Sequence, residues 1–265
     1  MIINTRLEKL NLENLTPIHA FLTDLSNQKN LINSFLGRPI SILFDGKITC
    51  SSCQKSIKKT FGEGYCYPCF ISVPESSPCV IRPELCEAHL GKGRDLDWEK
   101  KYHLQPHTVY LSLTSGLKVG VTRAGHDITR WMDQGAVAAI RLAETPNRYL
   151  AGCIEVALKD YVSDRTSLQK MLKHQIPDID LLSESKRLSQ LLPHDFQAYC
   201  VSEPKITTLT YPIGTPPEKV RSITLDKVPE FTSVLTGMKG QYLIFKDGVF
   251  NVRRHTGYHV TLTIN

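Results

Sequence analysis

The sequence predicts an α+β protein assembled from several small parts. Two Cys-x-x-Cys pairs in the first third of the chain predict a zinc ribbon. A hairpin followed by a helix, a strand and a helix predicts a three-stranded antiparallel sheet with helices. Short β-rich runs separated by Gly and Pro predict a small β-barrel or rolled sheet at the C-terminal end. The N-terminal segment, zinc-binding region, central domain and β-rich domain are expected at residues 1–45, 46–105, 106–195 and 196–265.

The N-terminal segment ends in a predicted hairpin. Residues 39–43 and 47–49 are β-rich and flank Asp45-Gly46, a dipeptide typical of a two-residue hairpin turn. Because a small sheet needs its edges covered, we expect this hairpin to pack on the C-terminal strands. The leucine pattern of residues 1–36 gives no assignment, since Pro17 interrupts the spacing of a helix.

Four cysteines form the most specific motif of the chain. Cys50 and Cys53 are followed, after twelve intervening residues, by Cys66 and Cys69. Each Cys-x-x-Cys places two thiolates at one tight turn, and two such turns complete the tetrahedral shell of Zn²⁺. Four thiolates leave no open coordination position, so the zinc is predicted to be structural. The alternative is a set of four buried or redox-active cysteines.

A second group of candidate zinc ligands follows directly. Cys79, Cys86, His89 and His103 have the chemistry of a Cys₂His₂ shell. The alternative is two ordinary buried cysteines with histidines on the surface. The glycines and charged residues over 91–101 predict an exposed connection to the central domain.

The central domain opens with a predicted hairpin. Residues 108–113 and 117–122 are β-rich and flank a Thr-Ser-Gly turn, whose glycine can adopt a positive φ. Tyr110 and Lys118 are therefore expected on adjacent strands.

A helix, a strand and a second helix are predicted to follow the hairpin. Asp127 is a predicted N-cap, and Gly135 a predicted end, for a short helix that carries Arg130. Residues 137–142 predict the third strand, and residues 148–162 predict the second helix.

Glu155 occupies an unusual position on the second predicted helix. At 3.6 residues per turn it shares a face with Ala151, Leu158 and Val162, so a carboxylate points to where apolar side chains gather. Such a carboxylate requires a cation, a metal ion or a hydrogen-bond donor. Glu155 is therefore either a metal ligand or the partner of an arginine that holds two elements together.

The order of these motifs resembles the GIY-YIG nuclease fold. Thr108-Val109-Tyr110 stands where that family has its first triplet, and Lys118-Val119-Gly120 stands where it has the second, with lysine in place of tyrosine. The stretches 118–123, 130–136 and 152–155 are also similar to an uncharacterised bacterial family, domain of unknown function twenty-seven ninety-seven. This likeness runs from about residue 40 to the C-terminus and implies a fold without an established activity.

The last part of the chain changes to strand patterns. Two further helices are predicted first, over residues 167–174, with a cap at 164–166, and over 181–192. Short β-rich runs with Gly and Pro between them then follow at a spacing typical of small barrels. The runs are residues 206–213, 220–225, 232–235, 242–245, 249–252 and 259–264.

The composition is that of a globular protein with a modest positive charge. With 265 residues, of which 41% are hydrophobic, the chain is long enough for a real core. No apolar run approaches the roughly 18 residues of a membrane span, and the start lacks a signal-peptide pattern, so we expect a cytoplasmic protein with reduced cysteines. The net charge of +6 is spread thinly, so phosphate binding would depend on local clusters.

The resemblance implies a metal-dependent nuclease that hydrolyses phosphodiester bonds in DNA or RNA. Glu155 would hold one Mg²⁺ or Mn²⁺, and Arg130 would neutralise charge on the phosphate oxygens. Tyr110 would orient or deprotonate the attacking water, and Lys118 would act as a phosphate clamp or as a base. The residues expected to support them are His107, Arg123 and Thr166.

Two other functions remain open from the sequence. One is a non-catalytic zinc-containing module that binds nucleic acid or protein, and the other is a structural scaffold whose groove is filled by side chains. Basic and aromatic residues suited to phosphate contact and base stacking would serve either nucleic-acid function. These residues are Arg123, Lys239, Arg253, Arg254 and Tyr258.

Overall fold

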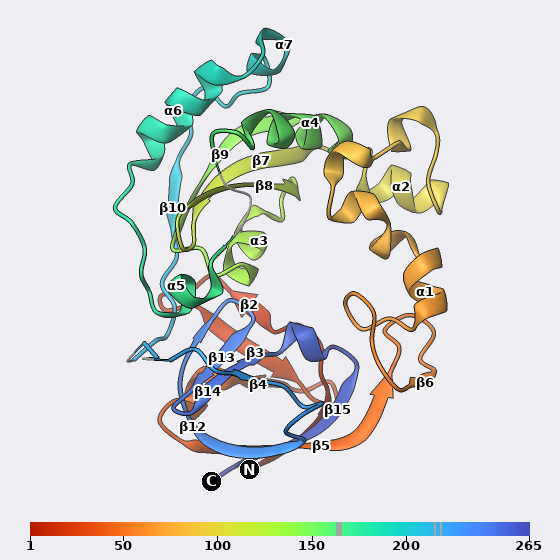
Figure 1. The fold of residues 1–265 in the computed structure, drawn as a ribbon, viewed down its shortest axis with the longest axis vertical. Coiled ribbons are helices and arrows are strands. Elements are labelled where there is room, and N and C mark those ends of the chain that lie inside the picture. Colours follow the sequence, from red (N-terminus) through yellow and green to blue (C-terminus); the bar gives the residue numbers. More distant parts are fainter. Residues whose placement is uncertain (163–165, 215, 218) are drawn as a thin grey trace. The chain divides into compact units, whose positions relative to one another are not determined.

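Helices and several antiparallel sheets make up the computed structural model, which describes residues 1–162, 166–214, 216–217 and 219–265 (Figure 1). The chain divides into two units. Unit 1 comprises Met1–Ile71 and Thr210–Asn265, and unit 2 comprises Ser72–Leu209. Unit 1 is thus built from both ends of the chain, and the α+β class predicted from the sequence is confirmed.

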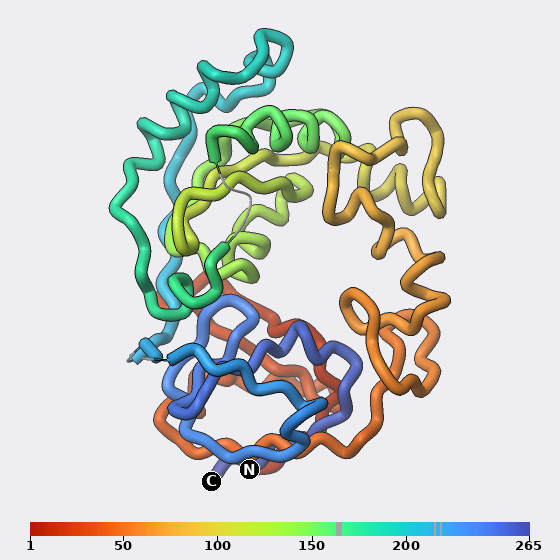
Figure 2. The backbone as a smooth tube through the Cα atoms, in the orientation of Figure 1, coloured from red at the N-terminus to blue at the C-terminus, as the bar shows by residue number. Residues whose placement is uncertain are grey.

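The main sheet of unit 1 joins strands from the two ends of the chain. Met1 and the last strand lie side by side, and the N-terminal ammonium donates to the carbonyl of Ile264 at 2.9 Å (Figure 2). All pairs are antiparallel except β11 with β14. The strand order is β1 (Ile2–Arg6), β15 (Tyr258–Ile264), β5 (Pro39–Thr49), β12 (Glu230–Lys239), β13 (Tyr242–Phe245), β14 (Gly248–Asn251) and β11 (Ser222–Ile223), and β6 (Ser56–Ile57) pairs with β5.

The predicted barrel is not closed. Among the described residues, β1 and β11 are the two ends of the strand order and do not pair with each other. The sheet instead buries one face against the N-terminal segment, where Leu10, Leu22 and Phe35 join Ile42 and Phe250 in one core.

The hairpin predicted at Asp45-Gly46 is wrong, because β5 runs through this dipeptide as one strand. Val260 pairs with Phe44 and Tyr258 with Ile48, so the residues between Phe44 and Ile48 form a bulge. Gly46 has φ +83°, and the Asp45 carboxylate accepts from the backbone N–H of Lys47 at 2.8 Å. The positive φ and the side-chain contact that are typical of a hairpin turn therefore occur here in a bulge within one strand.

Residues 1–36, which the sequence left unassigned, contain strands β1 to β4 and one short helix. β2 (Asn11–Glu13), β3 (His19–Thr23) and β4 (Lys29–Leu31) make a small antiparallel sheet, which the 3₁₀ helix η1 (Ile32–Phe35) follows. Ala20 and Leu22 are buried in alternation with less buried neighbours, as the two-residue period of a strand requires.

The sheet of unit 2 contains the predicted hairpin. β7 (His107–Leu113) and β8 (Leu117–Arg123) pair along their whole length, and β9 (Ala138–Thr145) pairs with the other edge of β7. β10 (Ile206–Thr208) adds a fourth strand beyond β9, which leaves β8 at the opposite end of the strand order. All three pairings are antiparallel.

Helices cover this sheet on two faces. α4 (Arg148–Leu158) and α6 (Leu181–Leu191) pack on the face that carries Val109 and Leu111. α3 (Asp127–Asp133) lies on the other face, where Trp131 packs edge-on against Tyr110 at 5.9 Å between ring centroids. The remaining helices of unit 2's second half are α5 (Leu168–Leu172) and α7 (His194–Gln197).

Some of the predicted helix ends agree with the structure and others do not. Asn147 caps α4 by accepting from the backbone N–H of Leu150 at 3.0 Å. Asp127 is not a cap, because its carboxylate binds the Arg141 guanidinium at 2.7 Å instead. Of the cap predicted at 164–166, residues 164 and 165 lie outside the described part of the chain.

Short helices connect the main sheet of unit 1 to the hairpin. One of them, α2 (Leu96–Tyr102), lies within the connection that was predicted as exposed. Asp95 caps α2 by accepting from the N–H groups of Asp97 and Trp98. Within the described residues, no helix is both long and apolar enough to span a membrane. The other short helices are α1 (Tyr67–Ser72), η2 (Pro74–Ser76), η3 (Pro78–Val80), η4 (Pro83–Leu85), η5 (Ala88–Leu90) and, near the C-terminus, η6 (Arg253–His255).

Candidate functional site

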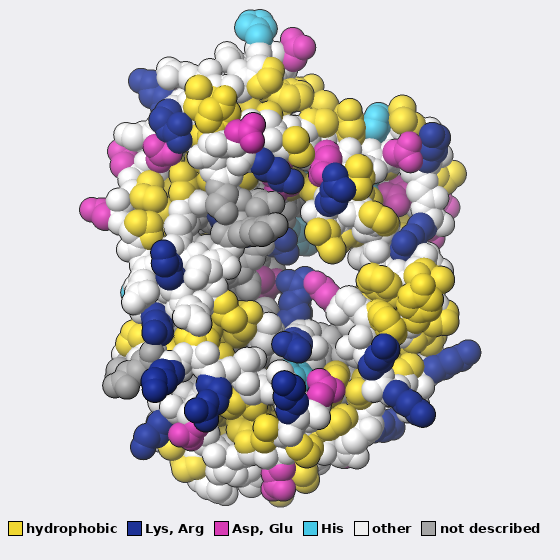
Figure 3. All heavy atoms as spheres, viewed as in Figure 1, with side chains coloured by type: hydrophobic (Ala, Val, Ile, Leu, Met, Phe, Trp, Pro, Cys, Tyr) yellow, Lys and Arg dark blue, Asp and Glu magenta, His cyan; other side chains and the backbone are white. Residues whose placement is uncertain are grey.

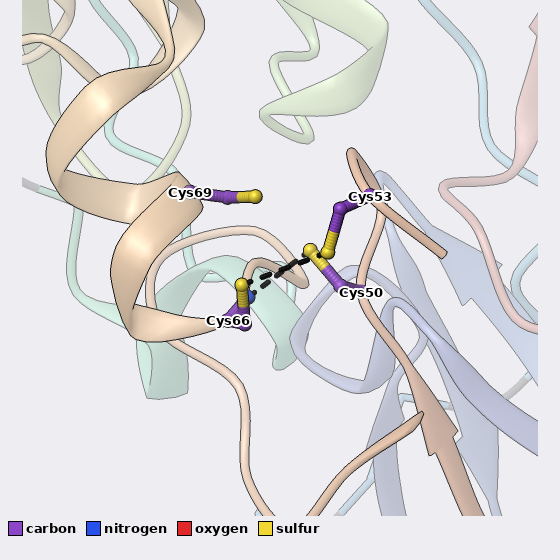
Figure 4. A group of neighbouring side chains, drawn as sticks. All are labelled: Cys50, Cys53, Cys66 and Cys69. Carbon is purple, nitrogen blue, oxygen red and sulfur yellow. Dashed lines mark hydrogen bonds between the residues drawn. The ribbon is translucent and has the colours of Figure 1, made fainter. Parts of the chain in front are cut away.

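The four cysteines of the Cys-x-x-Cys pairs converge in unit 1. Cys50 and Cys53 lie on the loop after β5, Cys66 and Cys69 lie at the start of α1, and the sulfurs point toward one another (Figure 4). The Sγ atoms of Cys53 and Cys66 are 3.8 Å apart. Two sulfurs bound tetrahedrally to one zinc ion at about 2.3 Å would be separated by about 3.8 Å. The group therefore has the donor set and spacing to bind a metal ion such as zinc.

The environment of Cys50 favours its thiolate form, which is the form that binds metal. Burial opposes ionisation, but backbone N–H groups of Cys66, Cys53 and Ser52 prevail and lower the pKa of the Cys50 thiol to about 6. The Cys66 N–H group lies 3.2 Å from the Cys50 sulfur.

Three of the four residues predicted for a second zinc shell also converge. The sulfurs of Cys79 and Cys86 lie 3.9 and 3.6 Å from Nδ1 of His103, and all three residues are buried. His89 is not part of this group, because its exposed ring stacks on Tyr149 at 4.3 Å between centroids. The predicted Cys₂His₂ shell therefore lacks His89 in this structure.

All four residues predicted for catalysis line one cavity of unit 2. Tyr110, Lys118, Arg130 and Glu155 surround about 370 Å³ beside β8. Tyr110 and Lys118 come from the hairpin, Arg130 from α3 and Glu155 from α4, so three elements meet here. Further polar residues that line the cavity are Thr122, Arg123, Gln134, Arg148 and Lys159.

Gln134, which the sequence did not indicate, connects two of these residues. Its amide lies 2.9 Å from the Tyr110 hydroxyl, and one orientation satisfies all three groups. In that orientation the Gln134 nitrogen donates to Tyr110, and its oxygen accepts from Nε and Nη2 of Arg130 at 3.1 Å. The network fixes the direction of the Arg130 guanidinium.

Tyr110 is held as a neutral phenol. It is fully buried, and this burial raises its pKa, although the neighbouring Arg130 charge acts in the opposite direction. A neutral hydroxyl orients a water molecule or a phosphate oxygen by hydrogen bonding, whereas a phenolate would be needed to remove a proton.

Gly120 provides the space that the Tyr110 ring occupies. The two residues pair across the hairpin, and a Cβ atom at Gly120 would lie 2.6 Å from the Tyr110 hydroxyl oxygen and 2.7 Å from Cζ. Both distances are much shorter than van der Waals contact. The Tyr110 ring can therefore occupy its observed place only with glycine at residue 120.

Replacing Gly120 with alanine is expected to lower the free energy of unfolding by about 1–3 kcal/mol, the usual cost of overpacking a core. The Tyr110 ring would have to shift, which would disturb the hydrogen bond between its hydroxyl and Gln134. Thermal denaturation of Gly120→Ala should show this loss. Gly116→Ala is the matched control, since a Cβ there meets nothing within 4 Å. Equal midpoints for the two variants would contradict the close packing at Gly120.

Arg148 and Gly152 hold a second wall of the cavity in place. Nε and Nη2 of Arg148 donate to the carbonyls of Cys79 and Val80 at 2.9 and 2.8 Å. A Cβ at Gly152 would lie 2.2 Å from the backbone nitrogen of Glu84, so η4 packs directly on α4. Neither contact was predictable from the sequence, in which the one visible signal is a glycine inside a helix.

The charge of the cavity is strongly positive. Among its described lining residues, five side chains are cationic and one is a carboxylate. Lys118 is only 8% exposed, and Arg123 lies over the Tyr102 ring at 4.9 Å and contacts His126. The arrangement suits an anionic ligand, with Glu155 as the one negative group within it.

The other predicted site residues are not among those that line this cavity. His107 is buried, with Nδ1 2.7 Å from the carbonyl of Gln105, and Thr166 is 2.9 Å from Thr114 through their hydroxyls. Lys239 and Tyr258 are 0% and 4% exposed, so neither side chain is accessible to a nucleic acid that binds the surface of unit 1.

Two predicted contact residues remain at the surface of unit 1. Arg254 is exposed, while Arg253 contacts the carboxylate of Glu63. On the face seen in Figure 3, Lys and Arg side chains lie as separate groups among other residue types.

Comparison with known proteins identifies a family and no individual relative. Neither the curated proteins nor the solved structures give a significant match. One family model, described as "Protein of unknown function (DUF2797)", matches residues 37–260, which include every residue of the cavity and both cysteine groups. The chain therefore belongs to the DUF2797 family of proteins of unknown function.

Proposed function

We propose that the cavity of unit 2 binds a phosphodiester of DNA or RNA and hydrolyses it with a GIY-YIG-like site. The observation that carries this proposal is the convergence of five cations, one carboxylate and a buried tyrosine hydroxyl in one cavity. Cations bind the phosphate, and a lone carboxylate among them is the expected site of a divalent metal ion. The antiparallel order of β9, β7 and β8, with α3 and α4 on opposite faces, supports the fold resemblance.

The donor set fits one Mg²⁺ or Mn²⁺. Glu155 is the only carboxylate among the described residues of the cavity, and it is half-buried there, so water and a substrate phosphate would supply the remaining oxygen ligands. When bound, the ion would act as a Lewis acid toward the phosphate.

The protein side chains have distinct parts in this proposal. Arg130, fixed by Gln134, donates to the phosphate oxygens on which charge develops. Tyr110, as a neutral phenol, orients the attacking water by hydrogen bonding. Lys118 holds a second phosphate oxygen from the adjacent strand, and Arg123 and Lys159 extend the positive surface for the flanking phosphates.

The four-cysteine group of unit 1 is proposed to hold a structural Zn²⁺. Soft thiolate ligands in a tetrahedral set favour zinc over the hard cations. With every ligand position taken by Cys50, Cys53, Cys66 and Cys69, this ion would have no open site for chemistry. Its role would be to stabilise the loop after β5 and the start of α1.

The proposed function is tested by cleavage of labelled single-stranded, duplex and branched DNA and RNA with Mg²⁺ or Mn²⁺ and with EDTA. Glu155→Gln is expected to lower metal-dependent cleavage at least about a hundredfold, comparable to loss of one electrostatic catalytic group. Binding of the same substrates should persist, because the five cations remain. Glu203→Gln, at an exposed glutamate outside the cavity, is the matched control and should cleave like the wild type.

A wild type that binds these substrates but cleaves none of them under any metal condition would exclude hydrolysis and leave a nucleic-acid-binding module. A wild type that neither binds nor cleaves would exclude both, and would favour an interaction protein stabilised by zinc.

A further inference from the structure

The segment that carries the four cysteines of unit 1 also presents a cluster of apolar side chains to solvent. Tyr67 and Ile71 on α1 are 56% and 52% exposed, and Phe61 and Phe70 are half-buried. The centroid of the Phe61 ring lies 5.2 Å from that of Tyr67 and 6.2 Å from that of Phe70. Hydrophobic side chains gather over α1 in Figure 3, with Lys and Arg side chains beside them. These four residues form what we call the aromatic face.

The local structure holds the aromatic face at the surface. Its three members on α1 lie three and four residues apart, so they share one side of the helix. Phe61 reaches them from a tight turn, in which its backbone exchanges hydrogen bonds of 2.8 and 3.1 Å with Tyr65. A Cβ at Gly62 would lie 3.0 Å from Cε2 of Phe70, so this turn packs directly against the Phe70 ring. The rings are therefore fixed by one another while α1 buries none of its residues.

The surroundings of the aromatic face are positively charged. Lys55, Lys58 and Lys59 are exposed on the loop between the two cysteine pairs, and none of them forms an ion pair within the described residues. The Lys59 ammonium lies over a ring of the aromatic face, 5.0 Å from its centroid. The one carboxylate between residues 46 and 74 is that of Glu63, which contacts Arg253. The charge of this segment is thus complementary to a polyanion.

Exposed rings beside lysines fit an unpaired nucleic-acid strand. Bases stack on aromatic side chains whatever their sequence, and lysines contact the phosphates of the backbone. In a duplex the faces of each base are covered by its neighbours, so a ring at a protein surface selects bases that are unpaired. An apolar protein partner would use the rings but would have no need of the lysines.

We propose that the aromatic face binds an unpaired strand of DNA or RNA, with a base stacked on Tyr67 and phosphates held by Lys58 and Lys59. The proposal rests on the proposed function, because the ligand is the nucleic acid that the cavity of unit 2 would hydrolyse, and it adds a requirement for a single-stranded segment. None of these residues lines that cavity, so the aromatic face can bind a strand whether or not the cavity hydrolyses it.

The test is binding of a labelled oligothymidylate of about 15 nucleotides to the full-length chain, by fluorescence anisotropy without added divalent metal. Tyr67→Leu is expected to lower the affinity about five- to a hundredfold, the effect of losing one stacked base. An abasic strand of the same length should bind wild type and Tyr67→Leu equally, because it has phosphates but no base to stack. The duplex with oligoadenylate should also bind both equally.

Lys59→Gln tests the phosphate contacts independently. It is expected to weaken binding of the thymidine strand and of the abasic strand alike, and to reduce the salt dependence of both, since one phosphate contact is lost. Lys29→Gln is the matched control, because Lys29 also lies over a ring of unit 1, that of Phe21 at 5.8 Å, but pairs with Glu13 on a strand outside the cysteine segment. It should bind both strands like wild type.

Equal affinity of wild type and Tyr67→Leu for the thymidine strand, with unchanged circular dichroism spectra, would overturn the proposal. Absence of binding by wild type would overturn it too, and would favour a protein partner for the aromatic face. If wild type and Tyr67→Leu bound and cleaved single strands equally, the proposed hydrolysis would stand without this surface. Binding that depends on Tyr67, with no cleavage under any metal condition, would support the aromatic face and exclude hydrolysis.

Discussion

Cys53→Ser is expected to release the metal ion of the four-cysteine group and to disorder residues 50–72. Structural zinc binds small domains with about 10–16 kcal/mol, and this free energy is part of their folding free energy. The segment contributes few side chains to the core, because α1 has no buried residue and β6 has only two residues. The loss should therefore be local but nearly complete.

Hydrogen exchange is the measurement that resolves this effect. Backbone amides in residues 50–72 should lose protection in Cys53→Ser, while the paired strands β1, β5 and β15 keep theirs. Cys200→Ser, at a half-buried cysteine outside both groups, is the control and should retain zinc and protection. Unchanged protection in Cys53→Ser, with the metal lost, would mean that packing alone holds this segment.

Features that depend on neighbours in the sequence were predictable. The Cys-x-x-Cys spacing located the four cysteines that could hold a metal ion, and the Thr-Ser-Gly turn located the hairpin of β7 and β8. Asn147 caps α4 where the helix was expected to begin. In each case the determining contacts lie within a few residues, so local chemistry is sufficient.

The Asp45-Gly46 dipeptide shows where local chemistry fails. Its glycine has the positive φ expected of a turn, and its carboxylate makes the expected contact with the backbone. β5 nevertheless continues, because β12 and β15 pair with it on either side and absorb the extra residues as a bulge. The partner strands come from the other end of the chain, so no window around residue 45 contains this information.

The site residues that were missed share this dependence on distant parts of the chain. Arg148 matters because its guanidinium donates to the carbonyls of Cys79 and Val80, which are far from it in the sequence. Gln134 matters because it lies between Tyr110 and Arg130. Such roles are set by packing between elements, which periodicity does not describe.

Gly152→Ala is expected to destabilise unit 2 and to weaken ligand binding in the cation-rich cavity. In an ordinary helix this change would stabilise by up to about 1 kcal/mol through helix propensity. Here the new Cβ would lie 2.2 Å from the backbone nitrogen of Glu84 and 2.4 Å from the carbonyl carbon of Pro83. Both are backbone atoms, so no side-chain rotation relieves the contact, and overpacking of about 3 kcal/mol outweighs the propensity.

The part of the cavity wall that Gly152→Ala would displace lies beside Glu155, the proposed metal ligand. Gly152 and Glu155 are three residues apart on α4 and share a face, and Pro83 lines the cavity with Glu155. We expect the midpoint of thermal unfolding to fall by roughly 6–12 °C and the affinity for oligonucleotides to fall with it, as calorimetry and anisotropy titration would measure. Val156→Ala, at an exposed position of the same helix, should leave both unchanged. If Gly152→Ala instead raised the midpoint, helix propensity would be the dominant effect, and the packing of η4 on α4 could not be what holds the cavity wall.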